Sequence, residues 1–121
     1  MTEDAVVARL CNLPVDFKRM KLSSVSLVER SGYLEFPKAL SPNRVELYLR
    51  DNPALVDAWQ IWSEDQRTSP AWAFEHKGAE YCVHLAPGGE RLSFTDRYKA
   101  CAEFVVRQIL SIARHAKKRP V

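Results

Sequence analysis

Residues 70–94 read PAWAFEHKGAEYCVHLAPGGERLSF and carry the clearest structural signal in the chain. Within it, bulky apolar side chains alternate with small or polar ones, which is the pattern of strands that have one covered face. Lys77-Gly78 and Pro87-Gly88-Gly89 interrupt the alternation and are typical of turns. The stretch therefore predicts three strands in an antiparallel meander. The covered face of this meander is expected to consist of Trp72, Phe74, Tyr81, Val83, Leu85, Leu92 and Phe94.

A long helix is expected directly after the meander. Thr95-Asp96 provides a capping side chain, and apolar residues then recur at spacings of three and four, the period of an amphipathic helix. This stripe is wide enough to close the open face of the sheet. Its members are Tyr98, Cys101, Ala102, Val105, Ile109, Ile112 and Ala113.

Two helices are expected directly before the meander. Ser41-Pro42 combines a capping hydroxyl with Pro at the first helical position, and this helix should end before Pro53, because the residue preceding Pro avoids the α region. Pro53 can open the second helix, which has Asp57, Gln60 and Glu64 on its polar side. The apolar side of the second helix is expected to hold Leu55, Val56, Trp59 and Trp62.

Further upstream, the helical signals are weaker. Residues 2–11 begin with Thr2 as a potential N-cap and with acids in the first turn. Pro14 interrupts this helix, and an amphipathic segment then resumes over residues 22–30 and stops at Gly32. The complete pattern predicts an α+β fold: N-terminal helices, a three-stranded antiparallel meander, and a long C-terminal helix packed on the sheet.

Length and composition indicate one domain. The chain has 121 residues, 46% apolar and 27% charged, which is typical of a globular protein and excludes a disordered tail or a disulfide scaffold. Met20 is an alternative start, so residues 1–19 are interpreted as a leader segment and residues 20–121 as a single α+β domain. Acidic residues stand where a secretory signal would be basic, and the three cysteines are an odd number, so we expect reduced thiols in the cytoplasm. No run of about 18 apolar residues occurs, so no membrane-spanning segment is expected.

The charge of the chain is unevenly distributed. From Arg97 onward there are seven basic residues and one acidic residue, Glu103, a net charge of +6. The whole chain carries +3, so the first 96 residues carry −3. A basic terminal helix on a mildly acidic body can contact RNA or an acidic partner, or can simply be solvated.

Signals for catalysis and for metal binding are weak. No Cys-x-x-Cys or His-x-x-x-His pair occurs, and Cys82 and His84 alone share one strand face, so no metal or cofactor is expected. Cys101 lies within an apolar stripe, where it fits as a small hydrophobe. Glu75 and His76 must point to opposite faces of their strand, which leaves His84 next to one of them as the remaining acid–base hypothesis. We therefore expect a protein that is not an enzyme and that has no catalytic residues.

The densest constellation lies at the junction between helix and sheet. Three tryptophans within residues 59–72 frame Ser63, Asp65, Arg67 and Thr68. Asp65 and Arg67 can pair and hold the turn, in which case the constellation is a structural junction. Trp and Arg are also common interface anchors, which indicates a recognition patch instead. The candidate partner-binding residues are Trp59, Trp62, Asp65, Arg67 and Trp72, with Glu64 and Arg91 at the rim.

The order of these elements resembles that of small immunity proteins of bacterial contact-dependent growth inhibition and related polymorphic toxin systems. The similar features cover roughly residues 20–113, and Trp62 and Ala73 stand where the family pattern has Tyr and an aromatic residue. The similar segments are Leu27-Val28-Glu29-Arg30-Ser31-Gly32-Tyr33-Leu34, Leu49-x-x-x-Pro53-x-Leu55-Val56-x-x-Trp59, Trp62-Ser63-x-Asp65-x-Arg67-Thr68-x-x-x-Trp72 and Ala100-Cys101-Ala102-x-Phe104-Val105.

The resemblance implies a cytoplasmic, non-enzymatic toxin inhibitor that binds and neutralises the toxin domain delivered by a neighbouring bacterium. It does not specify the activity of the toxin or the oligomeric state. The alternative from the residues themselves is an RNA- or nucleotide-binding domain that uses the basic C-terminal helix and the strand carrying His84. Phosphate binding of that kind weakens steeply as the salt concentration rises.

Overall fold

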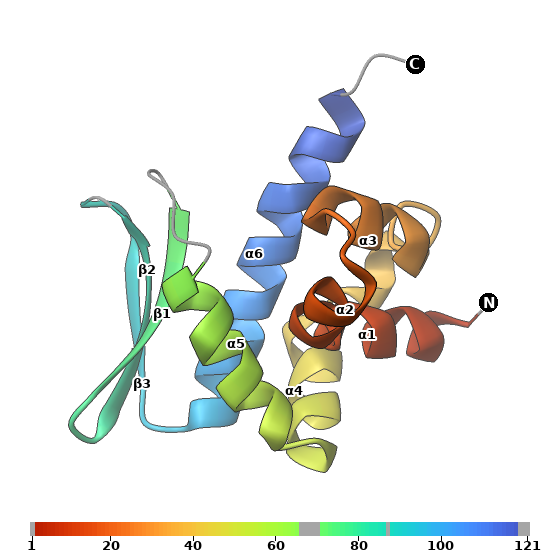
Figure 1. The fold of residues 1–121 in the computed structure, drawn as a ribbon. Coiled ribbons are helices and arrows are strands. Elements are labelled where there is room, and N and C mark those ends of the chain that lie inside the picture. Colours follow the sequence, from red (N-terminus) through yellow and green to blue (C-terminus); the bar gives the residue numbers. More distant parts are fainter. Residues whose placement is uncertain (1, 66–70, 87, 119–121) are drawn as a thin grey trace.

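A computed structural model describes residues 2–65, 71–86 and 88–118. It confirms the predicted α+β fold, with helices on one side of a three-stranded antiparallel sheet and a long C-terminal helix against that sheet (Figure 1). The elements in chain order are α1 (Glu3–Cys11), α2 (Leu13–Met20), α3 (Ser24–Ser31), the short 3₁₀ helix η1 (Pro37–Ala39), α4 (Pro42–Asp51), α5 (Ala54–Asp65), β1 (Ala71–Lys77), β2 (Glu80–Ala86), β3 (Arg91–Phe94) and α6 (Arg97–Lys118).

Three of the helices begin at the predicted capping residues. Thr2 Oγ1 accepts a hydrogen bond from the N–H of Ala5 at 3.1 Å, and Ser41 Oγ accepts one from Arg44 at 3.2 Å. Asp96 Oδ1 accepts from the N–H of Tyr98 at 2.8 Å at the start of α6. These side chains satisfy backbone donors that have no partner within their own helices.

Helix α2 was not predicted. The sequence indicated only a break at Pro14, whereas the chain turns after α1 and begins a second helix with Pro14 in its first turn, where a missing N–H has no cost. Asn12 holds the corner, because its Nδ2 donates to the carbonyl oxygen of Ala8 at 2.8 Å and to the hydroxyl of Tyr48 at 3.1 Å. The residues before Met20 thus form two helices.

The sheet has the order β1-β2-β3, and the predicted turn at Gly78 joins β1 to β2. Pro87, in the second predicted turn, lies outside the described residues. Phe74 lies opposite Val83, and Val83 lies opposite Leu92, so the expected face is continuous across the three strands. Phe74 and Val83 are completely buried, and the ring of Phe74 stacks on Phe104 of α6 with centroids 5.8 Å apart. The other five residues of this face are partly buried.

The outer edge of β1 is paired with α5 rather than with another strand. Ser63 Oγ accepts a hydrogen bond from the N–H of Phe74 at 2.8 Å, and Gln60 Nε2 donates to the carbonyl oxygen of Phe74 at 2.9 Å. Side chains of one helix therefore replace two hydrogen bonds of a missing strand, which protects this edge from pairing with other chains.

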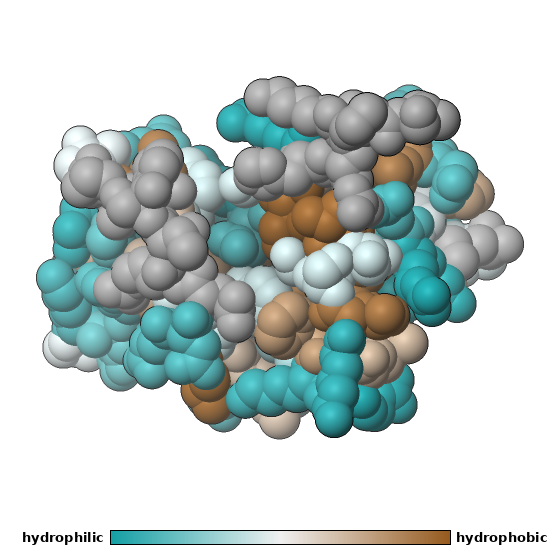
Figure 2. All heavy atoms as spheres, turned by 45° about the horizontal axis from the view of Figure 1, so that its top comes forward, coloured by the Kyte–Doolittle hydropathy of each residue, from teal (hydrophilic) through white to brown (hydrophobic). Residues whose placement is uncertain are grey.

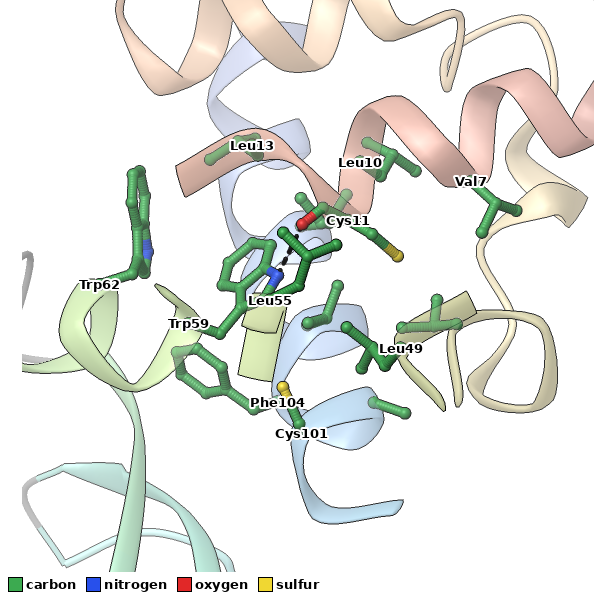
Figure 3. Packing of buried hydrophobic residues seen from close by; sticks show 14 of the residues in the cluster. Val7, Leu10, Cys11, Leu13, Leu49, Leu55, Trp59, Trp62, Cys101 and Phe104 are labelled. Carbon is green, nitrogen blue, oxygen red and sulfur yellow. Dashed lines mark hydrogen bonds between the residues drawn. The ribbon is translucent and has the colours of Figure 1, made fainter. Parts of the chain in front are cut away.

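The hydrophobic core lies between the helices and the inner face of the sheet. Trp59 is completely buried near its centre, against Phe104, with ring centroids 5.9 Å apart (Figure 3). Helix α1 contributes Val6 and Leu10 and the start of α2 contributes Leu13, all of them essentially inaccessible to solvent. The first twenty residues thus pack into the same core as the rest of the chain.

Candidate functional site

The predicted Trp patch separates into residues with different surroundings. Trp59 has no exposed surface, and its Nε1 donates a hydrogen bond to the carbonyl oxygen of Cys11 at 2.9 Å. In Figure 3, Trp59 lies in the middle of the cluster, whereas Trp62 lies at its outer side, one turn further along α5. In this structure Trp59 therefore presents nothing to a partner, and Trp62 lies between the core and the surface.

Trp62 forms the floor of a groove between α2 and α5. Its ring packs edge-to-face on Phe17 of α2, with centroids 5.1 Å apart and an interplanar angle of 86°. The side chain is 6% exposed, and its Nε1 has no hydrogen-bond acceptor among the described residues.

The groove is mostly apolar and has a volume of about 420 Å³. Val15 of α2 and Ile61 of α5 are 44% and 45% exposed, one on each wall. The residues that line the groove are Pro14, Val15, Phe17, Lys18, Arg19, Ala58, Ile61, Trp62 and Asp65. An exposed apolar strip of this kind can bury side chains of a partner.

The rims of this α2–α5 groove carry opposite charges. Lys18 and Arg19 lie on the α2 side, and Arg19 pairs with Asp16 at 3.0 Å. Asp65 lies exposed at the end of α5. Among the residues described here, neither Lys18 nor Asp65 has an ion-pair partner.

The remaining predicted residues lie elsewhere. Glu64 lines a polar pocket on the other side of α5, together with Asp57 and His76. Trp72 lies next to α6 under the guanidinium group of Arg107, 5.1 Å from its ring centroid. Arg91 is exposed on β3, opposite His84, and Arg67 lies outside the described residues. Of the seven candidates, the structure brings Trp62 and Asp65 together in the α2–α5 groove.

The face of the sheet away from the helices carries the acid–base pair that the sequence left open. His84 Nε2 lies 3.3 Å from Glu75 Oε2, and Lys77 Nζ lies 3.7 Å from the same oxygen. The His84 contact is an ion-pair distance rather than a hydrogen bond, because Nε2 has no hydrogen-bond partner among the described residues. His76 points to the inner face, where its ring stacks on Tyr81 with centroids 4.2 Å apart.

Within the described part of the chain, no three His, Cys, Asp or Glu side chains are grouped to hold a metal ion.

The cysteines are free and buried. Burial raises the pKa of the Cys11 thiol to about 12 and raises that of Cys101 well above its ordinary value. A thiol must ionise to act as a nucleophile, so these two side chains fill space in the core, as the position of Cys101 in an apolar stripe predicted.

The α2 wall is the part of the groove that sequence reasoning missed. Residues 13–20 read LPVDFKRM, in which Pro opens a helix and apolar residues recur on one side. That signal is present but short, and it does not indicate which element the apolar side faces.

Comparison with known proteins gives no further assignment, because no known family, curated protein or solved structure matches this chain.

None of the helices in the described residues combines the length and the apolar character needed to cross a membrane.

Proposed function

We propose that this chain is a cytoplasmic immunity protein that binds and neutralises a cognate toxin domain delivered by a neighbouring bacterium. The observation that supports this function best is the α2–α5 groove. It contains Trp62 and Asp65, two of the candidate partner-binding residues, and Asp65 belongs to a segment through which the sequence resembles such immunity proteins. It also contains the exposed apolar side chains Val15 and Ile61, one on each wall, and apolar side chains that gather in one exposed groove are typical of an interaction site.

The groove can hold a partner by non-covalent contacts alone, with no catalysed reaction. Val15 and Ile61 would be removed from water by an inserted apolar side chain, with Trp62 as the floor. Lys18 and Asp65 would select a partner with complementary charges and fix its orientation. Neutralisation then follows from occupancy, because a bound toxin domain has its working surface covered.

An interface of standard size needs about 800 Å² from each partner, which is more than the groove alone supplies. The exposed outer sides of α2 and α5 adjoin the groove and can supply the surrounding polar rim. The toxin would therefore extend over both helices, with its apolar anchors in the groove.

The test uses the C-terminal domain encoded by the reading frame next to this one in the source genome. We expect a one-to-one complex that survives about 0.5 M salt, at which exposed charge pairs are largely screened. Ile61→Glu should weaken this complex about tenfold or more, the effect of losing an interface anchor. The matched control is Leu47→Glu on α4, which places the same charge at a helix position that is 65% exposed and outside the groove.

The outcomes distinguish the proposed function from the proposed binding site. A salt-resistant complex that Ile61→Glu weakens and Leu47→Glu does not would support both the immunity function and the groove. A complex that neither variant weakens would keep the function and exclude the groove. Absence of a complex at any salt concentration would refute the proposed function.

A further inference from the structure

A second pocket lies between the sheet and the C-terminal half of α6, away from the α2–α5 groove. It has a volume of about 420 Å³ and is lined by Trp72 and Leu85 from the sheet and by Arg107, Leu110 and Arg114 from α6. Arg107 and Arg114 are seven residues apart, which places them on one side of the helix about 10.5 Å from each other along its axis. The pocket therefore combines an aromatic ring with two guanidinium groups.

Trp72 and Arg107 form a prearranged flat surface. The Arg107 guanidinium lies over the half-buried indole ring, 5.1 Å from its centroid. It is held there by Glu103, one turn earlier on α6, and by Glu90 at 3.5 Å. These two carboxylates compensate its charge, so Arg107 contributes a fixed planar surface rather than a free cation.

Arg114 provides the uncompensated charge. It is exposed, and among the described residues it has neither an ion pair nor a hydrogen-bond partner for its side chain. The chain from residue 104 to its end contains five basic residues and no acidic residue, and α6 continues through Lys117 and Lys118. Because Glu103 and Glu90 compensate Arg107, the net positive charge comes from the four basic residues after it, and such a cluster attracts a polyanion.

The arrangement in space makes this end of α6 accessible. The last turns of α6 extend past α3 and past the sheet (Figure 1). Figure 2 turns that end of the molecule toward the viewer and shows hydrophilic residues around its margins, with hydrophobic residues nearer the middle.

We propose that the pocket formed by Trp72, Arg107 and Arg114 binds single-stranded nucleic acid, with a base stacked at Trp72 and Arg107 and the backbone phosphates beside Arg114. Aromatic and guanidinium planes next to a basic track are the features with which proteins bind single strands without reading their sequence. An acidic peptide would use the charge but not the stacking surface. This activity is additional to toxin binding and uses a different surface.

One part of the nucleic-acid hypothesis changes with the structure. The sequence suggested that the strand carrying His84 and the basic helix act together. His84 lies on the face of the sheet away from α6, since its neighbours Val83 and Leu85 belong to the inner face. The nucleic-acid site therefore uses Trp72 on the inner face of the sheet, not His84.

The first measurement is the fluorescence anisotropy of labelled oligothymidylate and oligouridylate, each about 12 nucleotides long, a length within the range that single-strand sites cover. We expect binding at about 50 mM salt that weakens as salt rises. The logarithm of affinity against that of salt should have a slope of about −2 to −3, as for three or four neutralised phosphates. No binding at about 50 mM salt would overturn the proposal.

Two charge-reversal variants then test whether binding takes place at the pocket beside Arg114. Arg114→Glu should weaken binding about fivefold or more and make the salt slope shallower by about 1. The matched control is Lys99→Glu, an exposed lysine at the opposite end of α6, which should have little effect. Equal effects of the two variants would show general attraction to the helix and would overturn the pocket.

Stacking is tested separately. Trp72→Leu should weaken binding by about five- to 150-fold, the range for loss of one base–aromatic stack, while Trp72→Phe should retain most of the affinity. Circular dichroism melting of both variants checks that the fold persists. Equal affinity of the Leu and Phe variants, or competition by poly-glutamate as strong as that by the oligonucleotide, would overturn the nucleic-acid assignment in favour of an acidic protein partner.

Discussion

The indole Nε1 of Trp59 donates a hydrogen bond of 2.9 Å to the main-chain carbonyl oxygen of Cys11, which precedes it by 48 residues. This bond joins α5 to the C-terminal end of α1, where carbonyl groups lack partners within their own helix. Trp62, three residues later on the same apolar side of α5, has no such acceptor within the described part of the chain. We therefore expect the two tryptophans to contribute differently to the free energy of unfolding, although the sequence pattern treats them alike.

Replacing Trp59 by Phe should lower the free energy of unfolding by about 2–4 kcal/mol, since the variant leaves a buried carbonyl unpaired and a small cavity beside Phe104. Urea unfolding followed by circular dichroism measures the change. Trp62→Phe is the matched control and should cost less, because its Nε1 loses no hydrogen bond. Equal losses in the two variants would show that the bond to Cys11 contributes nothing measurable.

Ser63→Ala should destabilise the protein by about 1–3 kcal/mol. Ser63 is 2% exposed, and its removal leaves the buried N–H of Phe74 without an acceptor. The same urea titration detects the loss, with exposed Ser93→Ala as a control of the same chemistry. Because β1 would then present an unpaired edge, we also expect more aggregation of Ser63→Ala during refolding. Unchanged stability would mean that water replaces the Ser63 hydroxyl at no cost.

Local chemistry explains which parts of the fold could be predicted. Thr2, Ser41 and Asp96 each cap a helix within three residues, so a short stretch of sequence carries the whole signal. The meander was equally predictable, because alternation and turn residues lie within one segment. Leu47 shows the limit of such patterns. It belongs to an apolar stretch of α4, yet its side chain is 65% exposed. The sequence does not indicate which apolar side chains of a helix other elements will cover.

The groove was predictable on one wall only. Periodicity places Trp62 on the apolar side of α5, but its partner Phe17 is 45 residues earlier, in a helix that was expected to be only a break. The pairing of α2 with α5 depends on how the corner at Asn12 sets the direction of α2. Tertiary contacts of this kind have no short-range signature, so the groove and its opposite charges emerge only from the packed structure.

Cys11 and Cys101 should resist thiol reagents in the folded protein. Burial raises the pKa of Cys11 to about 12 and also raises that of Cys101, so hardly any thiolate is present at pH 8. In a Cys82→Ser variant, which leaves these two thiols, we expect dithionitrobenzoate to react only as fast as the chain unfolds and to label both thiols at once in urea. Rapid labelling under native conditions would contradict the burial of this part of the core.

Stability should also fall in acid through Asp96. Burial acts to raise the pKa of this carboxyl, but hydrogen bonds from Arg50 Nη2 at 2.5 Å and from the N–H groups of Tyr98 and Lys99 outweigh it, so the net pKa lies below the ordinary value. A lowered pKa in the folded state means that the stabilisation is complete above about pH 4, the pKa of an unfolded Asp, and is lost as the pH falls through the folded-state value.

Urea midpoints of the parent protein and of Asp96→Asn, measured between pH 7 and pH 2, test this contribution of Asp96. Asn keeps a side-chain oxygen that can cap α6 but does not titrate, so the variant should be less stable than the parent protein at pH 7 and should approach it at pH 2. The other carboxylates titrate in both proteins, and their contributions cancel in the difference. A difference in midpoint that stays constant across the whole range would show that the charge of Asp96 beside Arg50 adds nothing to stability beyond the cap.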